Sequence, residues 1–210
     1  MTTRKPTIGL TGGIASGKSS AARVLHDLGI PIVDADAIAR EVVTVGSEGL
    51  AAIVEAFGPD VLAEDGSLNR ERMAQRVFAD ESARRKLQQI THPRIGALSA
   101  ERIAAALESD APYVVYDAPL LVEVGAHRGL DALIVVAADE PTQIARVLAR
   151  DDLTPEQARQ RIAAQLPLAR KIEAADYVIW NEGTLEQLAD RTREVHTAIL
   201  ERFAREGQEA

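Results

Sequence analysis

Eight residues near the start of the chain carry a strict spacing of glycine, lysine and serine. They read Gly-Gly-Ile-Ala-Ser-Gly-Lys-Ser over positions 12–19 and satisfy the pattern G-x-x-x-x-G-K-[ST]. In this pattern the backbone amides of a loop between a buried strand and a helix surround phosphate groups. An apolar run over 7–11 precedes the segment and a helical pattern follows it. Both flanks therefore agree with a phosphate-binding loop.

Each part of the loop has a chemical task. The glycines permit a tight turn, the Lys18 ammonium reaches the β- and γ-phosphates, and the Ser19 hydroxyl is a ligand for Mg²⁺. The alternative is a plain strand-to-helix turn with Lys18 in solvent, but the chain has only four lysines and one falls here. We predict nucleoside triphosphate binding by Gly12, Gly13, Ile14, Ala15, Ser16, Gly17, Lys18, Ser19 and Ser20.

Five short apolar runs predict the core of the fold. They cover 7–11, 30–33, 113–116, 133–136 and 177–180. Continuous rather than alternating apolar character is typical of parallel strands buried on both faces, and helical patterns lie between the runs. The sequence therefore predicts an α/β fold with a five-stranded parallel sheet covered by helices.

The spacing of the runs predicts two insertions. A crossover needs only about a dozen residues, yet about 80, mostly helical in pattern, separate the second run from the third. We assign 1–35, 111–140 and 175–210 to the core, 36–110 to a helical domain, and 141–174 to a lid. Thr154 before Pro155 and Thr184 before Gln187 predict two helix starts.

Three aspartates follow predicted strands. The carboxyl ends of parallel strands face a common crevice, so Asp34 and Asp36 suit a base at an acceptor hydroxyl. Either residue equally suits a helix N-cap. Asp117 ends the third run, where such proteins hold Mg²⁺, although aspartate before Pro119 is also typical of a turn. The residues alone leave these alternatives open.

Arginines are concentrated in the second insertion. Arg146 and Arg150 are four residues apart on a helical pattern and share a face. Guanidinium groups stabilise the charge that spreads over a transferring phosphoryl group, so we predict a catalytic role for this pair. The alternative is a solvated face with Arg150 paired to a neighbouring acid.

The late part of the chain lacks the N-K-x-D element of guanine-nucleotide switches. Asn181 heads the nearest segment, Asn-Glu-Gly-Thr, which suits either a nucleotide base pocket or a plain turn. A nucleotide-dependent switch and a kinase for another small molecule remain the alternative functions.

Composition excludes several classes of protein. The chain has 24 basic and 32 acidic residues, a formal net charge of −8, and no cysteine. The acid excess argues against a broad nucleic-acid or lipid surface, and thiol catalysis and cysteine-bound zinc are excluded. No apolar run approaches a membrane span, and no signal-type stretch precedes the first strand. We expect a cytoplasmic protein that binds small molecules, without nucleic-acid or membrane partners.

The motifs together resemble one enzyme family. The loop, Asp34-Ala35-Asp36 with Arg40, His92-Pro93, the run Pro119 to Glu123, and Arg146 to Asp152 resemble dephospho-CoA kinase in order and spacing over nearly the whole chain. The resemblance implies a P-loop kinase-type fold in which the helical insertion binds the acceptor. It implies transfer from ATP, with Mg²⁺, to the ribose 3′-hydroxyl of dephospho-CoA.

The resemblance also implies residue roles. Asp36, rather than Asp34, becomes the base, and Asp36, Arg40, His92, Pro119 and Leu120 become acceptor-binding residues. Taken alone, His92 before Pro93 favours a helix end. The loop departs from the family pattern at Ala15, where glycine is usual, and we expect the methyl group to be tolerated.

Overall fold

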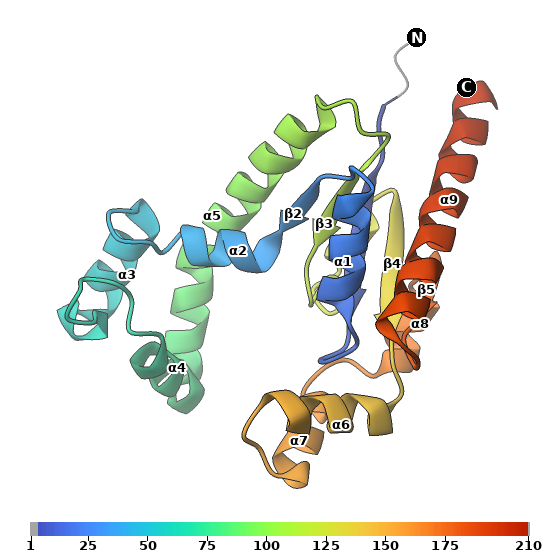
Figure 1. The fold of residues 1–210 in the computed structure, drawn as a ribbon. Helices are drawn as coiled ribbons and strands as arrows, with labels where there is room; N and C mark the ends of the chain where they lie inside the picture. The colour runs from blue at the N-terminus through green and yellow to red at the C-terminus, as the bar shows by residue number, and fades with distance from the viewer. Residues whose placement is uncertain (1–3, 210) are drawn as a thin grey trace. The chain divides into compact units, whose positions relative to one another are not determined.

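The computed structural model describes residues 4–209 (Figure 1). Residues 1–3 and 210 of the predicted core lie outside this range. The chain divides into two compact units: one runs up to Val33 and resumes at Ala105, and the other is Asp34–Ala104. The segment predicted as a lid, 141–174, belongs to the first and larger unit.

A five-stranded sheet forms the centre of the larger unit. Its strands are β1 Thr7–Gly12, β2 Ile32–Asp34, β3 Val114–Asp117, β4 Ala132–Ala137 and β5 Tyr177–Trp180. The order across the sheet is β2-β3-β1-β4-β5, and β1 pairs in parallel with both β3 and β4. The five apolar runs thus correctly predicted five parallel strands.

Helices complete the larger unit. They are α1 Lys18–Asp27, α6 Glu140–Arg150, α7 Pro155–Ala163, α8 Leu168–Glu173 and α9 Leu185–Glu209, with a 3₁₀ turn, Ala126–Gly129. Thr154 and Thr184 both form the predicted caps, each with a reciprocal glutamine contact three residues on. Helices α1 and α9 pack together beside the sheet (Figure 1). The apolar core between them includes Ile8, Leu25, Ile134 and Leu188.

The smaller unit is helical. It contains α2 Ala35–Glu41, α3 Glu48–Phe57, a 3₁₀ turn Pro59–Val61, α4 Arg70–Ala79 and most of α5 Glu81–Leu107. Within it the Phe57 ring lies beneath the cations of Arg76 and Lys86, whose distances to the ring centre are 5.8 and 5.6 Å.

Helix α5 corrects the expectation of a helix end at His92-Pro93. Pro93 lies inside this 27-residue helix, although proline removes one backbone hydrogen bond from a helix interior. The Arg94 guanidinium donates to the Ile90 carbonyl at 2.7 Å in the same turn. Helix α5 therefore continues through Pro93.

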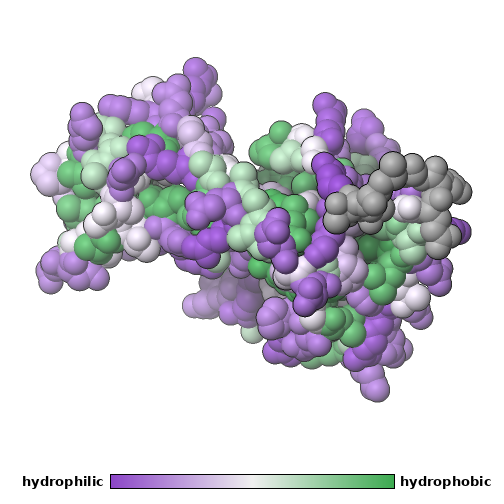
Figure 2. All heavy atoms as spheres, turned by 90° about the horizontal axis from the view of Figure 1, so that it is seen from above, coloured by the Kyte–Doolittle hydropathy of each residue, from purple (hydrophilic) through white to green (hydrophobic). Residues whose placement is uncertain are grey.

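Polar side chains predominate on the visible face of both units (Figure 2). Within residues 4–209, no helix combines the length and apolar character that a membrane crossing requires.

Candidate active site

The phosphate loop joins β1 to α1 and depends on glycine at its two ends. Gly17, which caps α1, has a left-handed φ of 95°. A side chain there would also collide with the amide of Asn181. At Gly12 a Cβ atom would lie 2.6 Å from the Val136 carbonyl oxygen. Both positions therefore require glycine for reasons of space, and Gly17 also for its conformation.

Three consecutive carbonyl groups of the loop are held by side chains from outside it. Gln143 Nε2 donates to Ile14 O at 2.8 Å, Arg146 Nη1 to Ala15 O at 3.3 Å, and Asn181 Nδ2 to Ser16 O at 2.8 Å. In a trans peptide the N–H points opposite to the C=O. The amides of Ala15 and Gly17 are therefore directed away from these side chains, as a phosphate-binding loop requires.

The tip of the loop has a further contact. The Ile14 amide donates to Gln165 Oε1 at 2.8 Å, so glutamine side chains bind both polar backbone groups of Ile14. Gln143 is buried. Sequence reasoning missed both glutamines. Only Gln143 could have been predicted from the sequence. It lies one helical turn before Arg146 on α6, and therefore on the same face of the helix as this candidate residue.

Asn181 follows β5 directly, in the turn that leads to α9, as one of its two sequence interpretations predicted. Its role in a nucleotide base pocket stays a prediction. Its side chain is buried beneath the loop, and its Oδ1 accepts a hydrogen bond from Arg146 Nη2 at 3.3 Å. In this structure the amide supports the loop backbone and links it to Arg146.

Lys18 forms an ion pair with Asp117, the last residue of β3. The sheet register explains this pairing, because Asp117 is the β3 partner of Leu10 on β1. Asp117 is buried, and a nearby cation offsets part of the free-energy cost of burying a carboxylate. The structure thus brings together the lysine and the aspartate that the sequence selected from separate motifs.

The residues at this point suit Mg²⁺ by their chemistry. Magnesium binds through one or two carboxylates together with waters and substrate phosphates. Asp117 supplies a carboxylate, and Ser19 an exposed hydroxyl in the first turn of α1. Among the described residues no cluster of three histidine, aspartate or glutamate side chains forms a protein-only metal site. This donor set fits a metal carried in with a nucleotide.

The two arginines of α6 have different partners. Arg146 contacts the loop and also donates to Asn181 O at 3.1 Å. Arg150 instead donates through Nε and Nη2 to both oxygens of Asp151, each at 2.9 Å. This bidentate contact lowers the pKa of the Asp151 carboxyl below its usual range, and Arg161 also pairs with the same carboxylate. The structure brings only Arg146 to the loop and pairs Arg150 with the neighbouring acid.

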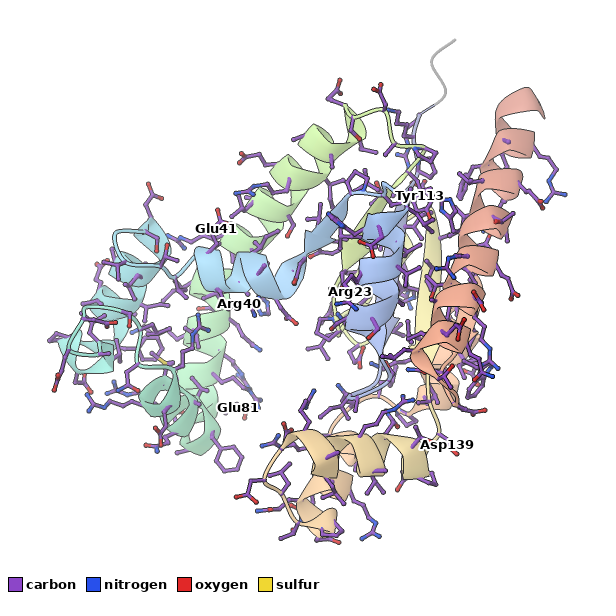
Figure 3. The ribbon with its side chains drawn as sticks, viewed as in Figure 1. Arg23, Arg40, Glu41, Glu81, Tyr113 and Asp139 are labelled. Atoms are coloured by element: carbon purple, nitrogen blue, oxygen red, sulfur yellow. The ribbon has the colours of Figure 1, made fainter. Side chains whose placement is uncertain are left out.

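Asp34 and Asp36 also separate into different environments. Asp34 Oδ1 accepts from the amides of Asp36 and Ala37, at 2.8 and 3.0 Å, and caps α2. Asp36 lies in the first turn and is exposed. The structure therefore assigns the cap to Asp34 and leaves the Asp36 carboxylate at the surface. Arg40, in the last turn of α2, is exposed as well (Figure 3).

The remaining residues that were predicted to bind the acceptor substrate are divided between the two units. His92 is an exposed residue of α5. In the larger unit, the Pro119 carbonyl accepts from Thr11 Oγ1 at 3.0 Å and from Lys171 Nζ at 3.2 Å, while Leu120 is exposed. Ser20 is partly exposed in the first turn of α1.

Ala15 adopts a left-handed backbone with φ of 55° and is the only described non-glycine residue with positive φ. This region is allowed for an L-residue but costs about 1 kcal/mol or more. The loop accommodates the Ala15 methyl group, as expected. Glycine would adopt the same left-handed backbone without this cost.

A phosphate loop between β1 and α1 and an acid at the end of the neighbouring strand, on a 2-3-1-4-5 sheet, define a P-loop kinase. Comparison with known proteins agrees. A protein-family model described as dephospho-CoA kinase matches residues 6–187. The dephospho-CoA kinase of Geobacter metallireducens is 50% identical over 180 residues, which cover 86% of this chain and 90% of the relative. The chain belongs to the dephospho-CoA kinase family.

Solved structures have the same fold. A protein from Thermus thermophilus matches with a TM-score of 0.81 and 32% identity over 94% of this chain and 99% of its own. The dephospho-CoA kinase from Campylobacter jejuni matches with a TM-score of 0.72 and 26% identity, over 93% and 97%.

Proposed function

We propose that this protein transfers the γ-phosphoryl group of ATP to the ribose 3′-hydroxyl of dephospho-CoA, giving coenzyme A and ADP in the last step of coenzyme A biosynthesis. The observation that carries the proposal is the family match over residues 6–187. That range contains the phosphate loop, the acids after β2 and β3, and the arginines of α6.

The residues divide the reaction into three tasks. The loop amides and Lys18 bind the β- and γ-phosphates. The Asp36 carboxylate accepts the proton of the acceptor hydroxyl as its oxygen attacks the γ-phosphorus and ADP departs. Arg146 and Arg150 stabilise the charge on the transferring group. For Arg150 this task requires release from Asp151, so its side chain exchanges one anionic partner for another.

Magnesium completes the proposed donor site. Bound with ATP, it neutralises charge on the β- and γ-oxygens. Ser19 and Asp117 are the residues of this chain that would hold it. Lys18 and Asp117 already neutralise each other, which limits the cost of burying either charge before the nucleotide arrives.

The remaining roles follow from the same function. Residues 36–110, with Arg40 and His92, bind the acceptor together with Pro119 and Leu120, and 141–174 act as a lid that excludes water from the transferred group. The substrates are small polyphosphates, and the net charge of −8 is compatible with them because the binding field is local. We place the enzyme in the cytoplasm, without nucleic-acid or membrane partners.

A coupled assay tests the function against its alternatives. Purified protein, ATP and Mg²⁺ are combined separately with dephospho-CoA, adenosine and common nucleoside monophosphates, and ADP is followed. Formation of ADP only with dephospho-CoA, with coenzyme A identified by mass spectrometry, supports the proposal. Transfer to adenosine or a monophosphate indicates another small-molecule kinase, and slow hydrolysis independent of any acceptor indicates a nucleotide switch.

A further inference from the structure

Lys171 is the only lysine or arginine that is buried among the described residues. It lies on the short helix α8, and only 1% of it is exposed. An ammonium group withdrawn from water is destabilising unless it is paired and hydrogen-bonded. Its partners therefore indicate what this lysine holds.

Both partners belong to one turn, residues 119–123, which follows β3. Lys171 Nζ lies 2.6 Å from Glu123 Oε1 and donates to Pro119 O at 3.2 Å. Thr11 Oγ1 donates to the same carbonyl at 3.0 Å. A carbonyl oxygen has two lone pairs, so Pro119 O is bound from β1 on one side and from α8 on the other.

The position of this turn matters because of what lies at its start. Asp117, which pairs with Lys18, is two residues before Pro119. A cavity of about 380 Å³ beside the loop is lined by Gly13, Gln143, Gln165 and Lys171, among others. Lys171 therefore contacts the turn from the side where α6 and the 163–168 segment meet the phosphate loop.

The ion pair is poorly explained as a source of stability. Replacing a buried ion pair with apolar residues of similar size is often neutral or stabilising. Within the described residues, both carboxylate oxygens of Glu123 are buried without a geometrically good hydrogen bond. Oε1 has only its charge contact with Lys171, so this pair is incompletely satisfied. We therefore explain this ion pair by its effect on position: it fixes the Pro119 carbonyl next to the site.

We propose that Lys171 is a positioning residue that holds the 119–123 turn in place for the acceptor substrate. The inference rests on the proposed function and adds to it a residue that does not itself touch substrate. Through Glu123 and the Pro119 carbonyl, Lys171 fixes the turn that carries Leu120, and so affects acceptor use more than binding of ATP to the free enzyme.

The test uses a double variant, Lys171→Met with Glu123→Leu, which removes both charges and leaves no lone buried carboxylate. We expect a melting temperature close to that of the wild type. We expect kcat/KM for dephospho-CoA to fall about tenfold or more, since small misplacements of binding groups are costly. The Kd of ATP measured without acceptor should change by less than about twofold.

A neighbouring variant supplies the control. Arg170→Met removes an exposed cation that pairs with Glu173 on the same helix, and its kinetics should match the wild type. Hydrogen exchange provides a readout that is independent of any substrate. The backbone amides of 117–125 should exchange faster in the double variant than in the wild type. In Arg170→Met their exchange rate should equal that of the wild type.

The outcomes separate the two proposals. If the wild-type protein does not phosphorylate dephospho-CoA, the proposed function is overturned. The comparison of hydrogen exchange over 117–125 between the double variant and the wild type still tests whether Lys171 holds the turn. A folded double variant with wild-type kinetics overturns the positioning role. A double variant whose ATP affinity and kcat/KM for dephospho-CoA fall equally also overturns it. So does a double variant in which hydrogen exchange over 117–125 is the same as in the wild type.

Discussion

The phosphate loop and the helical unit differ in how their proposed functional side chains are held. Lys18 is ion-paired to a buried aspartate, and three loop carbonyls are bound by side chains from α6 and from Asn181, which follows β5. In the helical unit, Asp36, Arg40 and His92 are exposed. Within the described part of that unit none of these three side chains forms a hydrogen bond or ion pair. The phosphate loop and Lys18 are therefore held by contacts within the protein, whereas the three side chains proposed to bind the acceptor are not.

This difference has a physical reason. Binding a phosphate to converging amides requires a backbone that is already arranged, because reorganisation during the reaction would reduce the stabilisation of charge. A carboxylate that accepts a proton needs access to the acceptor hydroxyl. The side-chain contacts to the loop carbonyls suit the first requirement, and the exposure of Asp36 suits the second.

The largest effect should follow loss of the loop lysine. Lys18→Ala removes the cation that contacts the phosphates, and we expect kcat/KM to fall about 1,000-fold or more. Steady-state kinetics with dephospho-CoA measures the loss. Lys86→Ala, in the helical unit, is the matched control and should retain wild-type rates. Activity of Lys18→Ala within tenfold of the wild type would contradict the assignment of the loop.

The variant also tests the folded state, because it leaves Asp117 buried without its cation. Lys18→Ala with Asp117→Asn removes both charges. The double variant should recover the melting temperature but not activity, because it also removes a proposed Mg²⁺ ligand. A melting temperature of Lys18→Ala well above the assay temperature shows that its loss of activity is not caused by unfolding.

The acidic pair on α2 offers a comparison inside the helical unit. Asp36→Asn removes the proposed base from an exposed position and should lower kcat about 100-fold or more with no change in melting temperature. Asp34→Asn removes the same charge but keeps a good N-cap, so kcat should stay close to the wild type. A larger kcat loss in Asp34→Asn than in Asp36→Asn would reverse the two roles.

The arginines of α6 test whether the side chains of the proposed lid, 141–174, are also held in place before substrate binds. Arg146→Ala removes contacts to Ala15 and Asn181, so we expect both a raised KM for ATP and a kcat lowered about 100-fold. Arg150→Ala leaves those contacts intact and should lower kcat about tenfold or more with little change in KM for ATP. Unchanged turnover in Arg150→Ala would remove Arg150 from the catalytic residues and leave it a surface partner of Asp151.

Much of the core and the loop was predictable because local sequence determines both. Five apolar runs mark the five strands, and the glycine spacing at 12 and 17 encodes a turn that only glycine permits. The capping boxes at Thr154 and Thr184 are equally local. Each signal lies within about ten residues of the structure that it predicts.

The contacts that organise the site are not local, and the sequence could not provide them. Gln165 and Asn181 reach loop residues that are 151 and 165 positions away in the sequence, and a glutamine or asparagine in a loop has no distinctive pattern. Lys171 was conspicuous as one of four lysines, but its partner in the 119–123 turn depends on packing of α8. Choosing between Asp34 and Asp36 as the cap required the position of the first turn of α2.

The smallest effect concerns the one loop residue that departs from the family pattern. Ala15 has a φ of 55°, and glycine adopts this conformation without the steric cost of a Cβ atom. Ala15→Gly should therefore change the free energy of unfolding by no more than about 1 kcal/mol in the stabilising direction, because greater freedom of the unfolded chain offsets part of the gain. Urea unfolding measures the change. A matched variant, Ala97→Gly on an exposed helical position, should destabilise by about the same amount. If Ala15→Gly destabilises as Ala97→Gly does, the left-handed backbone at position 15 carries no strain, and the loop is less constrained than its contacts indicate.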